Sequence, residues 1–125
     1  MMHGMIRALL VDDHAIVRKA FVRVLRLQQD IEVVGEAGDG KAAVNMVRDL
    51  RPDIVLMDIH MPILNGIEAT RRIHAKWPTV RVIGLSMFDS PEEAQPIRDA
   101  GAVAYVSKSK TPETLLETIR RCATV

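Results

Sequence analysis

Five polar residues stand where apolar runs of the sequence come to an end. They are Asp12, Asp13, Asp58, Ser86 and Lys108. Adjacent carboxylates such as Asp12 and Asp13 repel each other, and burial at the end of a strand disfavours the charged form of each. A divalent cation removes that penalty. Magnesium combines one or two carboxylates with waters and a phosphate oxygen, so the acidic pair indicates a magnesium site.

Phosphoryl transfer would use the remaining residues of this set. A carboxylate can be the nucleophile and form an acyl phosphate, and Asp58 suits this role because Asp12 and Asp13 are left to hold the metal. Lys108 offers a positive charge to the phosphoryl group, and Ser86 offers a hydrogen bond. The reaction requires this kind of charge neutralisation and positioning. No histidine or cysteine cluster in the sequence has zinc-site spacing.

The segments that must position these residues alternate between strand and helix patterns. Strands are predicted at 6–11, 31–37, 54–57, 80–85 and 102–106, and helices at 14–28, 41–50, 66–76, 91–100 and 111–122. Strands that are apolar throughout are buried on both faces, as in parallel sheets covered by helices. The sequence therefore predicts an α/β fold with a doubly wound, five-stranded parallel sheet. The five polar residues should meet at its carboxyl edge.

Composition limits the other classes of function. The chain has 125 residues, 48% hydrophobic and 26% charged, which is typical of a single globular domain over 1–125. A net charge of +1 and few, scattered aromatic residues argue against direct nucleic-acid binding. No apolar run is long enough for a membrane span. The single cysteine, Cys122, is typical of a cytoplasmic protein.

At these residues the sequence resembles a known family. The segments are VDDH at 11–14, DIVLMDIHMPILNGIEA at 53–69, VIGLSM at 82–87 and GAVAYVSKS at 101–109. Together they are similar to the receiver domain of two-component response regulators, and the resemblance covers essentially the whole chain. The opening DDH and the segment MDIHMP most resemble the NarL/FixJ-like (LuxR-type) subfamily. Its members often carry a helix-turn-helix DNA-binding domain.

The resemblance implies a flavodoxin-like receiver fold with strand order 2-1-3-4-5. It implies that Asp58 accepts a phosphoryl group from the histidine of a sensor kinase. The implied Mg²⁺ ligands are Asp12, Asp13, Asp58 and the backbone carbonyl of His60.

The resemblance also implies a contact between Lys108 and the phosphoryl group, and a conformational switch at Ser86 and Tyr105. The expected function is a phosphorylation-activated switch that controls transcription, with homodimerisation as one expected result of phosphorylation. DNA would be bound only by an output domain that this chain does not contain. The abrupt end of the sequence leads us to expect that the natural protein continues past Val125.

Two residues depart from the family pattern. Members often have proline, with a cis peptide bond, directly after the lysine, whereas Ser109 follows Lys108 here. A cis bond before a residue other than proline costs about 3 kcal/mol, so the resemblance does not set the geometry of this loop. Ser86 replaces the more common threonine, which keeps the hydroxyl group and loses a methyl group.

Two other functions would share the acidic site. An aspartate-nucleophile phosphatase of the haloacid dehalogenase type usually needs a second aspartate two residues after the nucleophile, as general acid. That position is His60 here. A degenerate receiver used only for docking would not need the complete set of acids, hydroxyl and lysine. The sequence therefore favours the switch over both alternatives.

Some of the residues singled out also have purely structural explanations. Asp13 could cap a helix that begins near His14. Gly38-Asp39-Gly40 is expected to be a turn with a helix cap rather than part of a phosphatase signature. His14 and His60 are expected to be loop or cap residues rather than side-chain ligands. The outer side of the first helix is expected to carry Arg18, Lys19, Arg23 and Arg26. We expect this side to be either a solvated face or a kinase-docking surface.

Pro96 conflicts with the helix predicted at 91–100. Pro91 suits a first helical turn, but a proline inside a helix loses a backbone hydrogen bond and crowds the preceding turn, at a cost of about 3 kcal/mol. We expect the helix either to start late, near Gln95 or Pro96, or to be kinked there. Residues 89–96 are then expected to be mobile before phosphorylation and ordered by phosphate or by a partner.

Overall fold

A five-stranded parallel sheet organises the computed structural model, which describes residues 4–87 and 90–123. The strands are β1 (Ile6–Val11), β2 (Ile31–Ala37), β3 (Ile54–Asp58), β4 (Arg81–Ser86) and β5 (Ala104–Ser107). Their order is β2-β1-β3-β4-β5, and each neighbouring pair is parallel. The predicted doubly wound sheet and the strand order implied by the resemblance are both confirmed.

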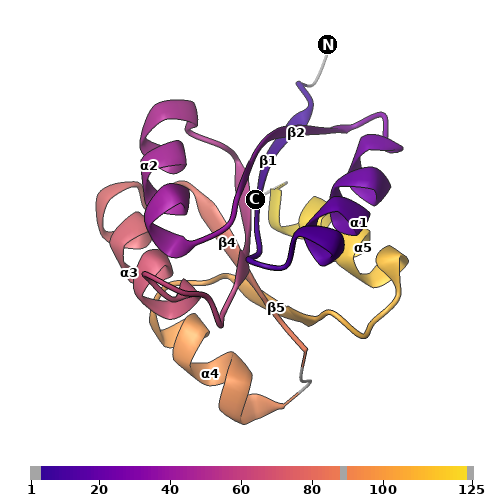
Figure 1. Ribbon diagram of the computed structural model, residues 1–125. Helices are drawn as coiled ribbons and strands as arrows, with labels where there is room; N and C mark the ends of the chain where they lie inside the picture. Colours follow the sequence, from indigo (N-terminus) through magenta and orange to yellow (C-terminus); the bar gives the residue numbers. More distant parts are fainter. Residues whose placement is uncertain (1–3, 88–89, 124–125) are drawn as a thin grey trace.

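Helices cover both faces of the sheet. They are α1 (Ala15–Arg26), α2 (Gly40–Leu50), α3 (Gly66–Lys76), α4 (Pro91–Asp99) and α5 (Pro112–Ala123). Figure 1 shows α1 and α5 on one face and α2, α3 and α4 on the other. The core is accordingly divided into two apolar clusters, one on each side of the sheet. The adjacent residues Leu9 and Leu10 enter opposite clusters, as the alternation of side chains along a strand requires.

At helical spacing, the inward face of α1 is predicted to carry Val17, Ala20, Phe21, Val24 and Leu25, and the observed face differs in part. Val22 and Leu25 are buried, and Phe21 and Val24 pack against the same cluster, but Ala20 is exposed. Successive helical residues are rotated by about 100°, so Ala20 lies nearly opposite Val22. The small methyl group of Ala20 carries little information about direction, which is why the apolar pattern alone misplaced it.

Helix α4 passes through Pro96. It runs without interruption from Pro91 to Asp99, so a start near Gln95 or Pro96 is wrong. Ile97 accounts for the difference, because its side chain is fully buried against Gly84 of β4. A Cβ at Gly84 would lie 2.9 Å from Ile97, so the glycine makes this close packing possible. Tertiary packing therefore offsets the hydrogen bond that the proline removes.

The end of α4 forms the glycine cap expected from the sequence. Gly101 has a φ of 121° and donates its N–H to the carbonyl of Arg98, while Ala102 donates to Ile97. This pair of bonds is the Schellman pattern. Asp89, the first residue of the segment expected to be mobile, lies outside the described residues, and the mobility of 90–96 stays a prediction. Within 4–87 and 90–123, no helix is long and apolar enough to cross a membrane.

Candidate functional site

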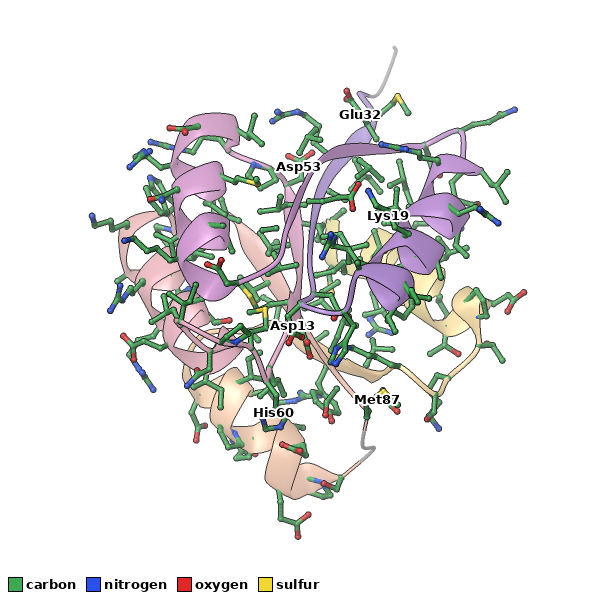
Figure 2. All side chains as sticks on the ribbon, in the orientation of Figure 1. Asp13, Lys19, Glu32, Asp53, His60 and Met87 are labelled. Atoms are coloured by element: carbon green, nitrogen blue, oxygen red, sulfur yellow. The ribbon has the colours of Figure 1, made fainter. Side chains whose placement is uncertain are left out.

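The carboxyl edge of the sheet brings the predicted site residues together. Asp58 is the last residue of β3 and Ser86 the last of β4, while Asp12 and Lys108 directly follow β1 and β5. In Figure 2 Asp13 lies at this edge, and His60 and Met87 lie on the same side of the molecule. The four strands thus place at one edge residues that are distant in sequence.

Lys108 joins two of the acids. Its Nζ lies 2.7 Å from Oδ2 of Asp12 and 3.2 Å from Oδ1 of Asp58. The side chains of Lys108 and Asp58 are each 5% exposed and that of Asp12 is fully buried, so water screens these ion pairs little. The backbone N–H of Lys108 also donates to the carbonyl of Ser86 at 2.7 Å. One ammonium group is therefore shared between two buried carboxylates.

The charge state of Asp58 is finely balanced. Burial raises the pKa of Asp58 to about 6, against the lowering effect of the Lys108 charge. The charge of Asp12 and the neighbouring carboxyl of Asp13 raise this pKa as well. A further cation at the site would favour the ionised form, which is the nucleophilic one.

Asp12 and Asp13 have different surroundings. Both oxygens of Asp12 are occupied, because Oδ1 accepts the N–H of His14 at 2.9 Å and Oδ2 accepts from Lys108. Oδ1 of Asp13 is buried and accepts no hydrogen bond, although Nδ1 of His14 lies 3.1 Å away. Asp12, not Asp13, therefore bonds the backbone at the start of α1, and the explanation of Asp13 as a helix cap is wrong. A buried carboxylate oxygen without a donor is costly and suits a cation.

These residues fit a hard divalent cation. Ligand atoms of Asp12, Asp13, His14 and Asp58 all lie within 4.8 Å of one another. Three carboxylates, one with a buried oxygen that lacks a donor, form a set of oxygen ligands such as Mg²⁺ prefers. His14 is the N-cap residue of α1, as expected, but its ring turns toward the acids rather than away from them.

The loop after Asp58 is held by close backbone packing. Gly66 donates its N–H to Ile59 at 2.8 Å, and a Cβ on Gly66 would collide with the carbonyl oxygen of Asp58. Nε2 of His60 lies 3.1 Å from Oε1 of Glu93 in the first turn of α4. The ring of His60 is thus directed to α4, in agreement with its expected role as a loop residue.

Ser86 and Tyr105 lie on neighbouring strands and share one face of the sheet. Tyr105 pairs in register with Gly84, two residues before Ser86, and side chains two residues apart point the same way. Ser86 is buried, and Tyr105 is half-buried against the cluster beneath α2, α3 and α4.

The loop after Lys108 is built without a cis peptide bond. No cis bond occurs between the residues that the structure describes, so the bond from Lys108 to Ser109 is trans. The hydroxyl groups of Ser107 and Ser109 lie 2.7 Å apart, and the N–H of Ser109 donates to Oγ of Ser107 at 3.2 Å. These local bonds order the loop after Lys108.

Arg18 belongs to the site and not to a solvated face. Its Nη1 donates to the carbonyl of Asp12 at 2.6 Å and its Nε to Oε1 of Glu36 at 3.0 Å. These contacts of Arg18 were missed because they depend on how α1 lies against β2, which helical periodicity does not report. Lys19, Arg23 and Arg26 are exposed, as expected.

Gly38-Asp39-Gly40 forms the expected helix cap, with Asp39 accepting the N–H of Ala42 at 2.8 Å.

Comparison with known proteins identifies the family. Residues 8–120 match the model of the response regulator receiver domain. The chain is 40% identical over 116 residues to the transcriptional regulatory protein LiaR of Bacillus subtilis, covering 93% of this chain and 55% of LiaR. It is 37% identical over 116 residues to the response regulator protein VraR of Staphylococcus aureus, covering 93% and 56%. The chain belongs to the response regulator receiver family.

Solved structures agree with this relationship. The signal receiver domain of the putative response regulator NarL from Mycobacterium tuberculosis has a TM-score of 0.92 and 30% identity, covering 98% of both chains. A LuxR-family response regulator from Aurantimonas sp. also has a TM-score of 0.92, with 36% identity over 97% of this chain and 86% of that one. The fold and the sequence relationship thus both identify the chain as a response regulator receiver domain. It spans about half the length of the curated relatives it matches.

Proposed function

We propose that Asp58 accepts a phosphoryl group from the histidine of a sensor kinase, and that this phosphorylation switches the domain. The contact of Lys108 with both Asp12 and Asp58 is the observation that carries the proposal. It holds a cation beside the acceptor, in a buried pocket where charge interactions are strong.

In the proposed reaction, a carboxylate oxygen of Asp58 attacks phosphorus while the bond from phosphorus to the donor nitrogen breaks. The ammonium of Lys108 pairs with the phosphoryl oxygens, and the hydroxyl of Ser86 donates a hydrogen bond to one of them. Asp12, Asp13 and Asp58, with the carbonyl of His60, would hold Mg²⁺, which neutralises phosphoryl charge when bound.

Phosphorylation of purified protein tests the assignment. Acetyl phosphate with Mg²⁺ should add the mass of one phosphoryl group to the wild type and none to Asp58→Asn. The control is Asp49→Asn, because Asp49 is an exposed acid on α2. Equal labelling of Asp58→Asn and the wild type would refute the role of Asp58.

The catalysis is limited, in this proposal, to phosphoryl transfer to Asp58 and hydrolysis from it. A phosphatase would need a general acid where His60 stands, and the ring of His60 contacts Glu93. Steady turnover of p-nitrophenyl phosphate by the wild type, lost in Asp58→Asn, would favour the phosphatase instead.

The switch is proposed to couple Ser86 to Tyr105. Capture of the phosphoryl group would draw the Ser86 hydroxyl toward Asp58, and the Tyr105 ring would move into the space released. A crystal structure with beryllofluoride, which mimics the phosphoryl group, tests this coupling. An unchanged Tyr105 rotamer and Ser86 position would contradict it.

The exposed side of α1 suits a kinase partner. Ile16 and Leu27 are 87% and 76% exposed, and the basic residues Lys19 and Arg23 lie between them. An apolar strip with positive charges favours an acidic, amphipathic helix as partner.

The proposal also includes transcriptional output through a DNA-binding domain, homodimerisation on phosphorylation and a cytoplasmic location. The relatives LiaR, a transcriptional regulatory protein, and VraR, a response regulator protein, support the proposed transcriptional output.

A further inference from the structure

We propose that Arg18 is a positioning residue, which orients the Asp12–Asp13 peptide so that both carboxylates face the cation and the acceptor. The proposal rests on the function proposed for Asp58. It adds to that function a residue that hydrogen-bonds the backbone of Asp12 and the carboxylate of Glu36.

Arg18 connects the end of β1 to β2. Its guanidinium donates to the Asp12 carbonyl at 2.6 Å and to Oε1 of Glu36 at 3.0 Å. The side chains of Arg18 and Glu36 are only 18% and 20% exposed. The second carboxylate oxygen of Glu36 pairs with Lys19 at 3.1 Å, so Glu36 is itself held on both sides.

These bonds fix the direction in which the chain leaves the sheet. The N–H of Asp12 donates to the carbonyl of Ala37 at 3.0 Å, and Arg18 fixes the carbonyl of Asp12 against the same strand. That carbonyl and the nitrogen of Asp13 belong to one planar peptide group. Orienting the carbonyl therefore also orients the bond that leads to Asp13 and its carboxylate.

The contact requires arginine. A guanidinium is planar and has several donors in a fixed fork, so it can bond a carbonyl and a carboxylate together. Lysine keeps the charge but has a compact ammonium without this fork. Burial acts to raise the pKa of Glu36, but the hydrogen bonds from Arg18 and Lys19 hold that pKa below its usual value. Glu36 is then ionised at neutral pH and balances the charge of Arg18.

The same chain contains a matched control. Arg120 donates to both oxygens of Asp30, at 2.8 and 2.9 Å, and these side chains are 41% and 50% exposed. Asp30 stands just before β2, at the end of that strand opposite Glu36. Arg120→Met therefore removes the same kind of ion pair without approaching the acids.

The test measures Mg²⁺ affinity by calorimetry, and the acetyl phosphate labelling rate at saturating Mg²⁺, in Arg18→Met, Arg18→Lys, Glu36→Gln and Arg120→Met. A loss of positioning should weaken Mg²⁺ binding about tenfold in both Arg18 variants, as for other residues that orient metal ligands. The labelling rate should fall as well, and Arg120→Met should change neither quantity.

The sign of the change separates positioning from electrostatics. Removing a cation near a Mg²⁺ site strengthens metal binding if charge alone acts, whereas positioning predicts weaker binding in Arg18→Met. Unchanged or tighter Mg²⁺ binding in folded Arg18→Met and Arg18→Lys would overturn the proposal. An equal loss in Arg120→Met would also overturn it. If Arg18→Met does not fold, the Mg²⁺ affinities of Arg18→Lys and Glu36→Gln test the proposal in its place. Mg²⁺ affinity is measured without phosphate, so failure of Asp58 labelling is distinguishable from failure of this proposal.

Discussion

The ammonium of Lys108 and the carboxylate of Asp12 lie 2.7 Å apart, and neither side chain is more than 5% exposed. Asp58 shares the same ammonium at 3.2 Å. A buried ion pair of this kind tells little about net stability, but removing one partner leaves an uncompensated charge. The arrangement therefore makes the site sensitive to any change in its balance of charges.

Lys108→Met should destabilise the metal-free protein by about 3 kcal/mol at pH 7.5, because Asp12 and Asp58 would lose their shared cation. The pKa of Asp58 should rise, since the Lys108 charge lowers it in the wild type. Urea denaturation measures the stability. Lys41→Met, an exposed position on α2, is the control. Equal losses in the two variants would contradict this expectation.

Asp58→Asn should stabilise the metal-free protein at neutral pH. Folding raises the pKa of Asp58 from 3.8 to about 6. The ionised form therefore destabilises the fold fully above about pH 6, partly between pH 4 and 6, and not at all below the unfolded-state pKa.

The stability gain in Asp58→Asn should be on the order of 2 kcal/mol at pH 7.5 and close to zero at pH 4. Denaturation curves at both pH values, with Asp49→Asn as control, provide the measurement. A gain that is independent of pH would show that the charge of Asp58 is not its source.

Asp13→Asn should weaken Mg²⁺ binding by about tenfold, or 1.4 kcal/mol. The buried Oδ1 of Asp13 lacks a hydrogen bond, whereas both oxygens of Asp12 are occupied. We therefore expect Asp13 and Asp58 to ligate the metal directly and Asp12 to act mainly through water. Trp77 lies beside Arg51, at the opposite edge of the sheet from the acids. Calorimetry is therefore a better measurement of Mg²⁺ binding than tryptophan fluorescence. Equal affinities of variant and wild type would refute direct ligation by Asp13.

Pro96→Ala should stabilise α4, because alanine supplies the N–H that the carbonyl of Glu92 lacks. We expect a gain of about 1–3 kcal/mol in stability and slower hydrogen exchange at residues 92–95. In the wild type these amides should exchange faster before phosphorylation than after it. Strong and equal protection in both states would contradict the predicted mobility. Gln95→Ala, one residue earlier, is the control.

The shared edge of the site residues was predictable because the apolar runs of β1, β3, β4 and β5 each end at a polar residue. Asp58 and Lys108 needed only the rule that parallel strands end at one edge. The contacts of Arg18 were not predictable in this way, since they depend on how α1 is rotated against β2. The burial of Val22 in place of Ala20 has the same origin.

The start of α4 was mispredicted for a different reason. A proline inside a helix has a local cost, but the sequence does not reveal that Ile97 finds a fully buried position against Gly84. This contact joins two segments whose relative placement only the fold defines.

Within α4, all of whose residues are described, Ile97 is the only buried residue. If α4 rotates about the buried side chain of Ile97, the two ends of the helix move in opposite directions. Glu93, which contacts His60, lies on one side of Ile97, and the Gly101 cap lies on the other. A small displacement of the loop after Asp58 would therefore change the tilt of α4 through the contact between His60 and Glu93, with every helical turn kept.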